Sequence, residues 1–252
     1  MIYDSFKTIF YCCTMKNIAL VIAGGIGARM HQDIPKQFIH VHDKPVIIYT
    51  LECFQRHPNI DAIEVVCLEG WQDILRAYCN QFEITKLENI VIGGTNGQDS
   101  IRNGLYDLAS RHVDGDEIVL IHDAIRPNLS MDIINENIRV CREYGNAITV
   151  VPCTAAMLKT FDSFTSVEQV KRDNLKASQT PQTFFLKEIV DVHKKALEVG
   201  ITNSVASCTL YIEMGMKLYM TPGSEKNIKI TTTEDIEIFM ALLNATRPLW
   251  LK

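Results

Sequence analysis

The sequence predicts an α/β protein with a mostly parallel β-sheet that helices cover on both faces. Short apolar runs of strand length alternate along the chain with amphipathic segments long enough to form crossover helices. The strand segments are apolar almost throughout, which is typical of strands buried from both sides. A chain of 252 residues is long enough to form one large domain of this class.

The expected elements follow one another in order from residue 18 to residue 151. We expect strands at Ile18–Ala23, Ala62–Leu68, Asn89–Ile92, Glu117–Ile121 and Ala147–Val151. We expect helices between them at Pro45–Phe54, Trp71–Phe82, Ser100–Arg111 and Met131–Tyr144. The proline at the start of the first helix suits the first turn, where its missing N–H group removes no intrahelical hydrogen bond.

The alternation of strands and helices stops between Pro152 and about Ser178. Two short pieces of this stretch, Met157–Phe161 and Val167–Lys171, alternate in polarity and predict a β-hairpin. We therefore expect a β-arm at about residues 153–178, outside the main sheet.

The last part of the chain returns to regular elements. A helix is expected at Leu186–Val199, strands at Lys217–Met220 and Asn227–Ile230, and a closing helix at Glu234–Ala245. The threonines before Glu234 supply a hydroxyl for the free amide groups at the start of that last helix, and Glu234 suits its first turn.

Composition limits the class of protein. The net charge of −5 argues against a general nucleic-acid-binding protein, which usually needs a basic surface. The eight cysteines include no C-x-x-C pair and no zinc-finger spacing, so we expect reduced thiols in the cytoplasm. Apolar runs are too short to cross a bilayer, so we expect no membrane association.

The segment before Met15 differs from the rest of the chain. It is aromatic and carries two adjacent cysteines, but it lacks the long apolar core of a signal peptide. We interpret residues 1–14 as an N-terminal extension, with Met15 as the natural start, and residues 15–252 as a single domain.

The loop after the first strand is the strongest candidate site. Gly24, Gly25 and Gly27 follow the apolar run, and glycines allow backbone N–H groups to turn toward an anion. Arg29 and Lys36 add positive charge beside them. This pattern predicts a nucleoside-triphosphate site, and the alternative is a strand that simply ends in a glycine turn.

Further polar clusters follow other strands, where open α/β sheets bind ligands. The stretch Gly93–Ser100 is a glycine turn that could hold a base or a ribose. Asp123 stands at a strand end, where a carboxylate together with phosphate oxygens could hold Mg²⁺. Arg126 could bind a phosphate in bidentate fashion, or it could form a structural pair with Asp123.

Two basic residues are candidates in the second half of the chain. Arg172 lies on the expected arm, where most charges are simply solvated. Lys229 alternates with Ile228 and Ile230, so its side chain points away from the apolar ones. It is either a solvent-facing residue or a phosphate ligand.

Together these residues resemble a known family. The motifs G-G-x-G-x-R-M, P-K-Q, G-G-x-x-x-x-D-S, H-D-A-x-R-P, Q-T-P-Q and N-I-K-I-T occur here in the order seen in the polyol-phosphate cytidylyltransferases. That family includes methylerythritol-4-phosphate and ribitol-5-phosphate cytidylyltransferases. The resemblance runs from about Lys16 to Ala245. It implies a Rossmann-like fold of nucleotidyltransferase type, and transfer of CMP from CTP to a polyol phosphate with release of pyrophosphate.

The resemblance also implies roles for residues. Arg29 and Lys36 would face the triphosphate, and Lys229 would face the α-phosphate in the transition state. Asp123 would hold Mg²⁺ and the ribose side. The residues implied to bind the nucleotide are Ala23, Gly24, Gly25, Gly27, Gly93, Gly94, Ser100 and Asp123. Arg126 follows the same motif on the substrate side, and Arg172 would reach the polyol phosphate across a homodimer interface made by interlocked arms.

Three positions depart from the family pattern. Gly97 stands where the family usually has an arginine, and Ala155 and Ala156 stand where an Asp-Thr pair usually meets the polyol phosphate. The acid that usually lies near Ala206 is missing. Because the last two departures fall on the acceptor side, we expect an intact CTP site with an altered polyol site.

Several functions remain open. The stretch Gly70–Tyr78 is more similar to the ribitol group, so we favour ribitol 5-phosphate slightly over methylerythritol 4-phosphate. A CTP-binding homologue without turnover is an alternative, because of the three departures. A dinucleotide-dependent oxidoreductase is a distant third, since Met30 stands where the third glycine of G-x-G-x-x-G belongs.

Overall fold

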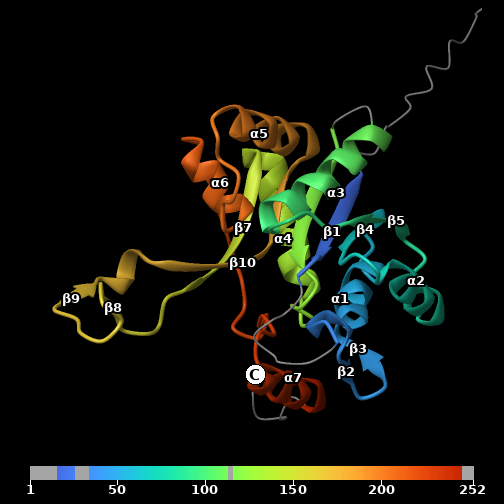
Figure 1. The fold of residues 1–252 in the computed structure, drawn as a ribbon, viewed down its shortest axis with the longest axis horizontal. Helices are drawn as coiled ribbons and strands as arrows, with labels where there is room; N and C mark the ends of the chain where they lie inside the picture. Colours follow the sequence, from blue (N-terminus) through green and yellow to red (C-terminus); the bar gives the residue numbers. More distant parts are fainter. Residues whose placement is uncertain (1–15, 26–33, 113–115, 246–252) are drawn as a thin grey trace, which may run out of the picture.

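The structure is a computed structural model, and it describes residues 16–25, 34–112 and 116–245. The expected N-terminal extension, Gly27 and Arg29 lie outside the described residues. A seven-stranded sheet in the order β11-β7-β10-β6-β1-β4-β5 forms the centre of the fold (Figure 1). Its strands are β1 Asn17–Ala23, β4 Ala62–Cys67, β5 Leu87–Ile92, β6 Ile118–Asp123, β7 Asn146–Pro152, β10 Lys176–Phe185 and β11 Met220–Pro222.

Strands β1, β4, β5 and β6 are parallel, and β11 is parallel to β7. Strand β10 is antiparallel to both of its neighbours, β6 and β7. The sheet is therefore mostly parallel, as the sequence predicts. A small antiparallel pair, β2 His40–Val41 and β3 Lys44–Pro45, follows the short 3-10 helix η2 Lys36–Phe38.

Helices cover both faces of the sheet, and alternate residues of one strand pack against the two layers. On β1, Ala19 and Val21 pack in the same core as residues of α1, α2 and α4, whereas Ile18 and Leu20 pack with α3, α5 and α6. The first layer contains α1 Val46–Gln55, α2 Gln72–Gln81 and α4 Met131–Tyr144. The second contains α3 Gly97–Arg111, α5 Leu186–Glu198 and α6 Ser207–Glu213. The prediction of helices on both faces is confirmed.

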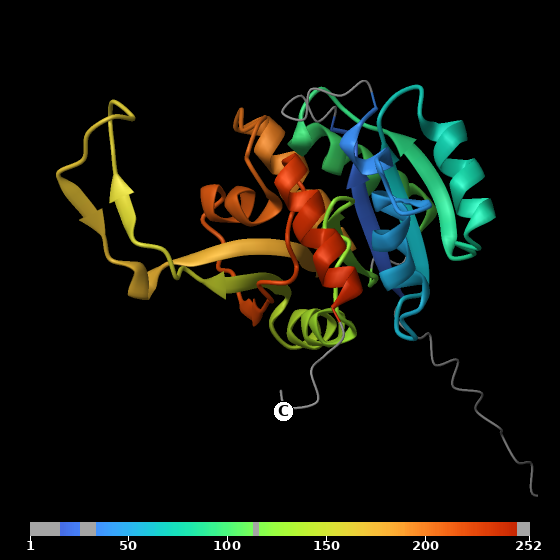
Figure 2. The same ribbon diagram turned by 90° about the horizontal axis from the view of Figure 1, so that it is seen from below.

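The expected arm is present. Strands β8 Met157–Lys159 and β9 Glu168–Val170 form an antiparallel hairpin, and the short 3-10 helix η3 Arg172–Asn174 follows. The hairpin projects away from the sheet and its helices (Figures 1 and 2). Its side chains include strongly exposed apolar ones at Leu158, Phe161, Phe164 and Val167.

The sequence did not predict β10, although this strand lies in the middle of the sheet. Pro181 interrupts it, and a proline normally argues against a central strand. The pairing with β7 shifts in register between Ser178 and Gln182, so the irregularity accommodates the proline. Strand β7 pairs with β10 on both sides of Pro181, and β6 pairs with β10 from Gln182 onward.

Two expected strands are wrong in whole or in part. Residues 227–230 form no strand. The segment passes the residues that follow β6, where Ile230 N–H donates to Ile125 O, and it does not pair with a neighbouring strand. The predicted alternation is nevertheless correct, since Ile228 and Ile230 both pack in the core. Strand β11 begins only at Met220, because the Asn146 side chain holds Lys217 O and Tyr219 N.

The closing helix, α7 Thr233–Asn244, begins as expected at a threonine cap. Thr232 Oγ1 accepts from Asp235 N–H, and the Asp235 carboxylate accepts from Thr232 N–H. The acid of this capping box is Asp235, one residue after the one that the sequence suggested.

Candidate active site

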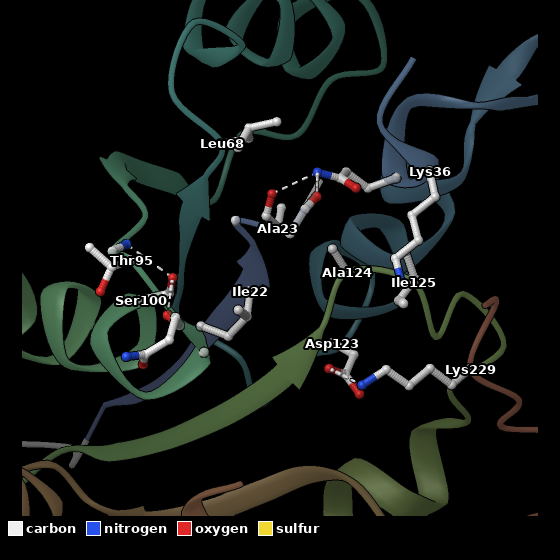
Figure 3. A pocket seen from close by; sticks show the side chains of 16 residues that line it. Ile22, Ala23, Lys36, Leu68, Thr95, Ser100, Asp123, Ala124, Ile125 and Lys229 are labelled. Atoms are coloured by element: carbon white, nitrogen blue, oxygen red, sulfur yellow. Dashed lines mark hydrogen bonds and ion pairs between the residues drawn. The ribbon is translucent and has the colours of Figure 1, made fainter. Parts of the chain in front are cut away.

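A cavity of about 490 Å³ lies at the carboxyl ends of the parallel strands. Figure 3 shows Lys36 and Lys229 on one side of it and Ser100 with Thr95 on the opposite side. The expected site residues that line it are Ala23, Gly24, Gly25, Lys36, Gly94, Ser100, Asp123 and Lys229. Segments from both ends of the chain therefore meet at one edge of the sheet, as open α/β sheets bring ligand-binding residues together.

The glycines of two loops let those loops touch. A Cβ atom on Gly93 would lie 3.3 Å from Gly24 Cα, and one on Gly24 would lie 3.1 Å from Ser100 Oγ. A Cβ atom on Gly94 would lie 2.3 Å from Asp99 Cβ. Gly24 and Gly93 therefore allow the two loops to pack closely, and Gly94 allows its own turn to pack against the start of α3.

Ser100 closes the turn between β5 and α3. Its Oγ accepts from Gly94 N–H at 3.0 Å and donates to Asn96 O at 2.9 Å. Asn96 caps α3 by accepting from Asp99 N–H. The hydroxyl predicted to contact the base thus also fixes the backbone that lines this side of the cavity.

Replacing Gly94 with alanine is expected to lower the free energy of unfolding by about 1–3 kcal/mol, because the new methyl group overlaps α3 backbone atoms. Gly97→Ala is the matched control for stability, since a Cβ atom there meets no atom within 4 Å. Denaturant unfolding of the two variants measures this difference. Equal stability of both would contradict the close packing of Gly94 against α3.

Gln37 is a site residue to which sequence analysis gave no role. Its amide is buried and donates from Nε2 to Ala23 O at 2.7 Å and to Gly25 O at 3.1 Å. It therefore fixes the loop after β1 and joins that loop to η2, which carries Lys36. In the sequence, Gln37 could be singled out only because it follows Lys36 in the P-K-Q motif. The motif does not predict which carbonyl groups the glutamine binds.

Asp123 is the electrostatic centre of the site. Its carboxylate accepts from Lys229 Nζ at 3.1 Å and from Arg126 Nε at 3.0 Å. Burial alone would raise the pKa of Asp123, but the charges of Lys229 and Arg126 hold this pKa below its usual range. The carboxylate is therefore ionised at neutral pH.

Arg126 serves as a structural partner in this structure. Besides Asp123 it reaches Asn227 O from Nη1 at 2.7 Å, and only 11% of its side chain is exposed. These contacts favour the structural alternative over a phosphate ligand. Arg126 still lines a second cavity, of about 290 Å³, beside the first.

The second cavity shares Asp123 and Lys229 with the first. Its other walls include residues of β10 and the start of α6, among them Gln179, Thr180 and Ala206. Two molecules bound in the two cavities would thus meet at one carboxylate and one ammonium group.

The position of Arg172 differs from that of the other expected site residues. It lies on the arm, where its Nη1 donates to Thr154 O at 2.6 Å. It is absent from the described lining of both cavities. The structure therefore does not bring Arg172 to the site of its own chain.

Asp123 is the candidate metal ligand at this site. Among the residues that the structure describes, no group of three or more His, Cys, Asp or Glu side chains could hold one. Within the described part of the chain, Asp123 is the residue that offers a carboxylate to both cavities. This fits Mg²⁺, which usually takes one or two carboxylates and completes its shell with phosphate oxygens and water.

No helix within the described ranges has the length and apolar character needed to pass through a membrane.

The fold and this pair of joined cavities define a nucleotidyltransferase, and comparisons with known proteins support that class. The family model described as 2-C-methyl-D-erythritol 4-phosphate cytidylyltransferase (IspD) matches residues 17–245. The chain therefore belongs to the IspD family of cytidylyltransferases.

Individual relatives cover nearly the whole chain. A ribitol-5-phosphate cytidylyltransferase from Lacticaseibacillus paracasei is 40% identical over 89% of this chain and 97% of its own length. A 2-C-methyl-D-erythritol 4-phosphate cytidylyltransferase from Clostridium botulinum is 38% identical over 88% of this chain and 94% of its own. A solved 4-diphosphocytidyl-2C-methyl-D-erythritol synthase from Anaerococcus prevotii has a TM-score of 0.76 and 26% identity, covering 92% of this chain and 99% of its own.

Proposed function

We propose that the protein transfers CMP from CTP to the phosphate of ribitol 5-phosphate, giving CDP-ribitol and pyrophosphate. The observation that carries the proposal is the pair of cavities that meet at Asp123 and Lys229. CTP would occupy the larger cavity between the two glycine loops, and the acceptor would occupy the smaller one. Ribitol 5-phosphate is favoured because relatives named for it reach 40% and 41% identity.

The chemistry requires no covalent intermediate on the protein. An oxygen of the acceptor phosphate attacks the α-phosphorus of CTP, a new P–O bond forms, and the bond to the β-phosphate oxygen breaks as pyrophosphate leaves. The protein positions the two anions and offsets the charge that develops between them. Lys229 stands where the cavities meet, so we assign its ammonium group to the α-phosphate, and we assign Lys36 to the triphosphate. Arg29 would add positive charge to the triphosphate.

We propose Mg²⁺ as the cofactor. Asp123 would hold it together with phosphate oxygens of CTP, and the ion would offset the charge of the leaving pyrophosphate. The Lys229 side chain bound to Asp123 is 42% exposed, so its ammonium group can exchange this carboxylate for a phosphate.

We further propose a homodimer in which the arm of one subunit completes the site of the other. Apolar side chains that are 67% to 105% exposed gather on the arm, as is typical of surfaces that bind another protein. Arg172 lies at the base of the hairpin, away from its own cavity, so a partner's arm could bring it to the acceptor phosphate.

An acceptor screen tests the function. We expect pyrophosphate release and a CDP-polyol product from CTP, Mg²⁺ and ribitol 5-phosphate, with lower kcat/KM for methylerythritol 4-phosphate. Turnover of methylerythritol 4-phosphate alone would reverse the choice of acceptor. CTP binding by calorimetry without pyrophosphate release for any acceptor would instead support the homologue without turnover, which Gly97, the alanines Ala155 and Ala156, and the missing acid near Ala206 suggest.

A further inference from the structure

The 201–207 segment, which leads from α5 into α6, forms one wall of the smaller cavity. The residues of this segment that line the cavity are Val205, Ala206 and Ser207. Residues 201–206 belong to no helix or strand, and the side chains of Thr202, Asn203 and Val205 are exposed. Apolar packing therefore does little to place the segment, and its hydrogen bonds decide where this wall lies.

Gln98, in the first turn of α3, holds the 201–207 segment through both ends of its amide. Its Nε2 donates to Ile201 O at 3.0 Å, and its Oε1 accepts from Ser204 N–H at 2.6 Å. Gln98 is only 3% exposed. A buried amide that makes both bonds fixes these two backbone groups relative to α3, because losing it would leave both of them without this partner.

The start of α3 also forms a wall of the larger cavity, which Asn96 and Ser100 line. Asn96 Oδ1 accepts from Asp99 N–H, and Ser100 Oγ accepts from Gly94 N–H. These bonds hold the nucleotide side of the turn without Gln98. Gln98 therefore fastens the 201–207 segment to a part of the fold that keeps its own shape.

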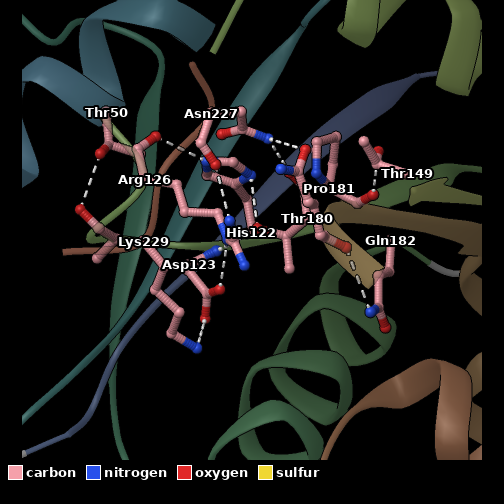
Figure 4. Close-up of polar contacts among 12 residues, drawn as sticks. Thr50, His122, Asp123, Arg126, Thr149, Thr180, Pro181, Gln182, Asn227 and Lys229 are labelled. Atoms are coloured by element: carbon pink, nitrogen blue, oxygen red, sulfur yellow. Dashed lines mark hydrogen bonds and ion pairs between the residues drawn. The ribbon is translucent and has the colours of Figure 1, made fainter. Parts of the chain in front are cut away.

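Another wall of the smaller cavity, at the end of β6, is held by separate contacts. Thr180 Oγ1 accepts from Asp123 N–H at 3.1 Å and lies 3.0 Å from His122 Nδ1 (Figure 4). The Asp123 carboxylate accepts from Arg126 and Lys229. Helix α3 takes part in none of these contacts. The charged groups shared by the two cavities should therefore keep their places when a side chain of α3 is replaced.

We propose that Gln98 is a positioning residue for the acceptor, because it holds residues 201–204 against α3 and so sets where residues 205–207 lie in the smaller cavity. Gln98 is absent from the described lining of both cavities, so it acts through this segment. Residues 201–210 include no acidic or basic side chain, so the segment contributes to acceptor binding through the position of its backbone and small side chains. This inference rests on the proposed function.

The test compares two amide side chains of α3. Gln98→Met keeps the length of the side chain but removes both of its hydrogen-bonding groups. Asn103→Leu is the matched control, because Asn103 Nδ2 donates to Ile92 O at 3.2 Å, and Asn103 is absent from the described lining of both cavities. If Gln98→Met folds poorly, Gln98→Ala removes the amide with a good helix former and gives the same comparison.

We expect Gln98→Met to raise KM for ribitol 5-phosphate about tenfold, since two hydrogen bonds that hold one wall of its site are lost. The dissociation constant of CTP and kcat at saturating acceptor should stay within about twofold of the wild-type values, because the nucleotide side and the charged groups keep their own contacts. Asn103→Leu should leave KM for both substrates unchanged. Steady-state kinetics and calorimetry measure these quantities.

Wild-type turnover is measured first, and its absence with every acceptor would refute the proposed function rather than this inference. In that case the dissociation constant of ribitol 5-phosphate in the presence of CTP replaces its KM in the comparison. An unchanged value for the acceptor in Gln98→Met, an equal rise in the dissociation constant of CTP, or an equal effect of Asn103→Leu would overturn the positioning role.

Discussion

Replacing Lys229 with methionine is expected to lower kcat by about 100-fold or more, a size typical of removing one preorganised donor to transition-state charge. The ammonium group lies between the two cavities, so it faces the phosphorus at which charge develops. Its side chain is 42% exposed and its partner Asp123 keeps Arg126, so the loss of folding stability should stay below about 1 kcal/mol. Steady-state kinetics with CTP and ribitol 5-phosphate, together with thermal unfolding, measure both quantities.

Lys226→Met is the matched control for this variant. Lys226 lies three residues earlier on the same segment, is exposed, and is absent from the described lining of both cavities. Its kcat should equal that of the wild type. Near-normal turnover of Lys229→Met would show that Lys229 is not a catalytic residue. We expect Lys36→Met to lower kcat in the same way as Lys229→Met.

Combining two inactive variants in one dimer is expected to restore activity. Arg172→Ala should lose activity because its arm no longer offers the guanidinium to the partner's acceptor phosphate, and Lys229→Met loses it within its own cavity. In a symmetric dimer that exchanges arms, the mixed dimer has one site with both defects and one with neither. It should therefore reach about half of the wild-type rate.

Co-expression with two different tags yields the mixed dimer, and each variant dimer alone is the control. The arm side chain Arg172 donates to Thr154 O within its own chain, so its loss should leave the body of the protein folded. Activity of the mixed dimer no higher than that of the two variants would contradict an exchange of arms. A monomer in sedimentation or light scattering would contradict it as well.

The sequence predicted regular elements best where one pattern dominated. The parallel strands from β1 to β7 and the helices between them follow from runs of apolar residues, because burial from two sides leaves little choice of structure. Strand β10 was missed because Pro181 contradicts the local pattern, and only its pairing with both β6 and β7 overrides that signal. At Asn227–Ile230 the predicted alternation of buried and exposed side chains was correct, but the predicted strand was wrong. An alternating pattern indicates which side chains face the core, and it does not determine which backbone groups form hydrogen bonds.

In the candidate site, too, some features could be predicted from the sequence and others could not. Glycines and basic residues near strand ends located the cavity, because strand ends of a parallel sheet lie at one edge. The partners of these residues could not be predicted. Gln37 holds carbonyl groups of the loop after β1, and Ser100 fixes a turn, whereas the pair of Arg126 with Asp123 was already one of the alternatives from the sequence. Such contacts depend on which groups the folded chain brings within hydrogen-bond distance of each other.

By itself, the sequence determined the α/β class, the glycine loop after β1, the basic residues and their order along the chain. These are local properties, because periodicity, glycine content and charge can be read from short segments of the chain. The tertiary structure alone decided that Lys36 and Lys229 line one cavity, that Arg172 does not, and that Thr180 joins Asp123 to His122. The physical reason is that residues 57 to 106 positions apart, such as Asp123 with Thr180 and Lys229, meet only once the sheet has formed.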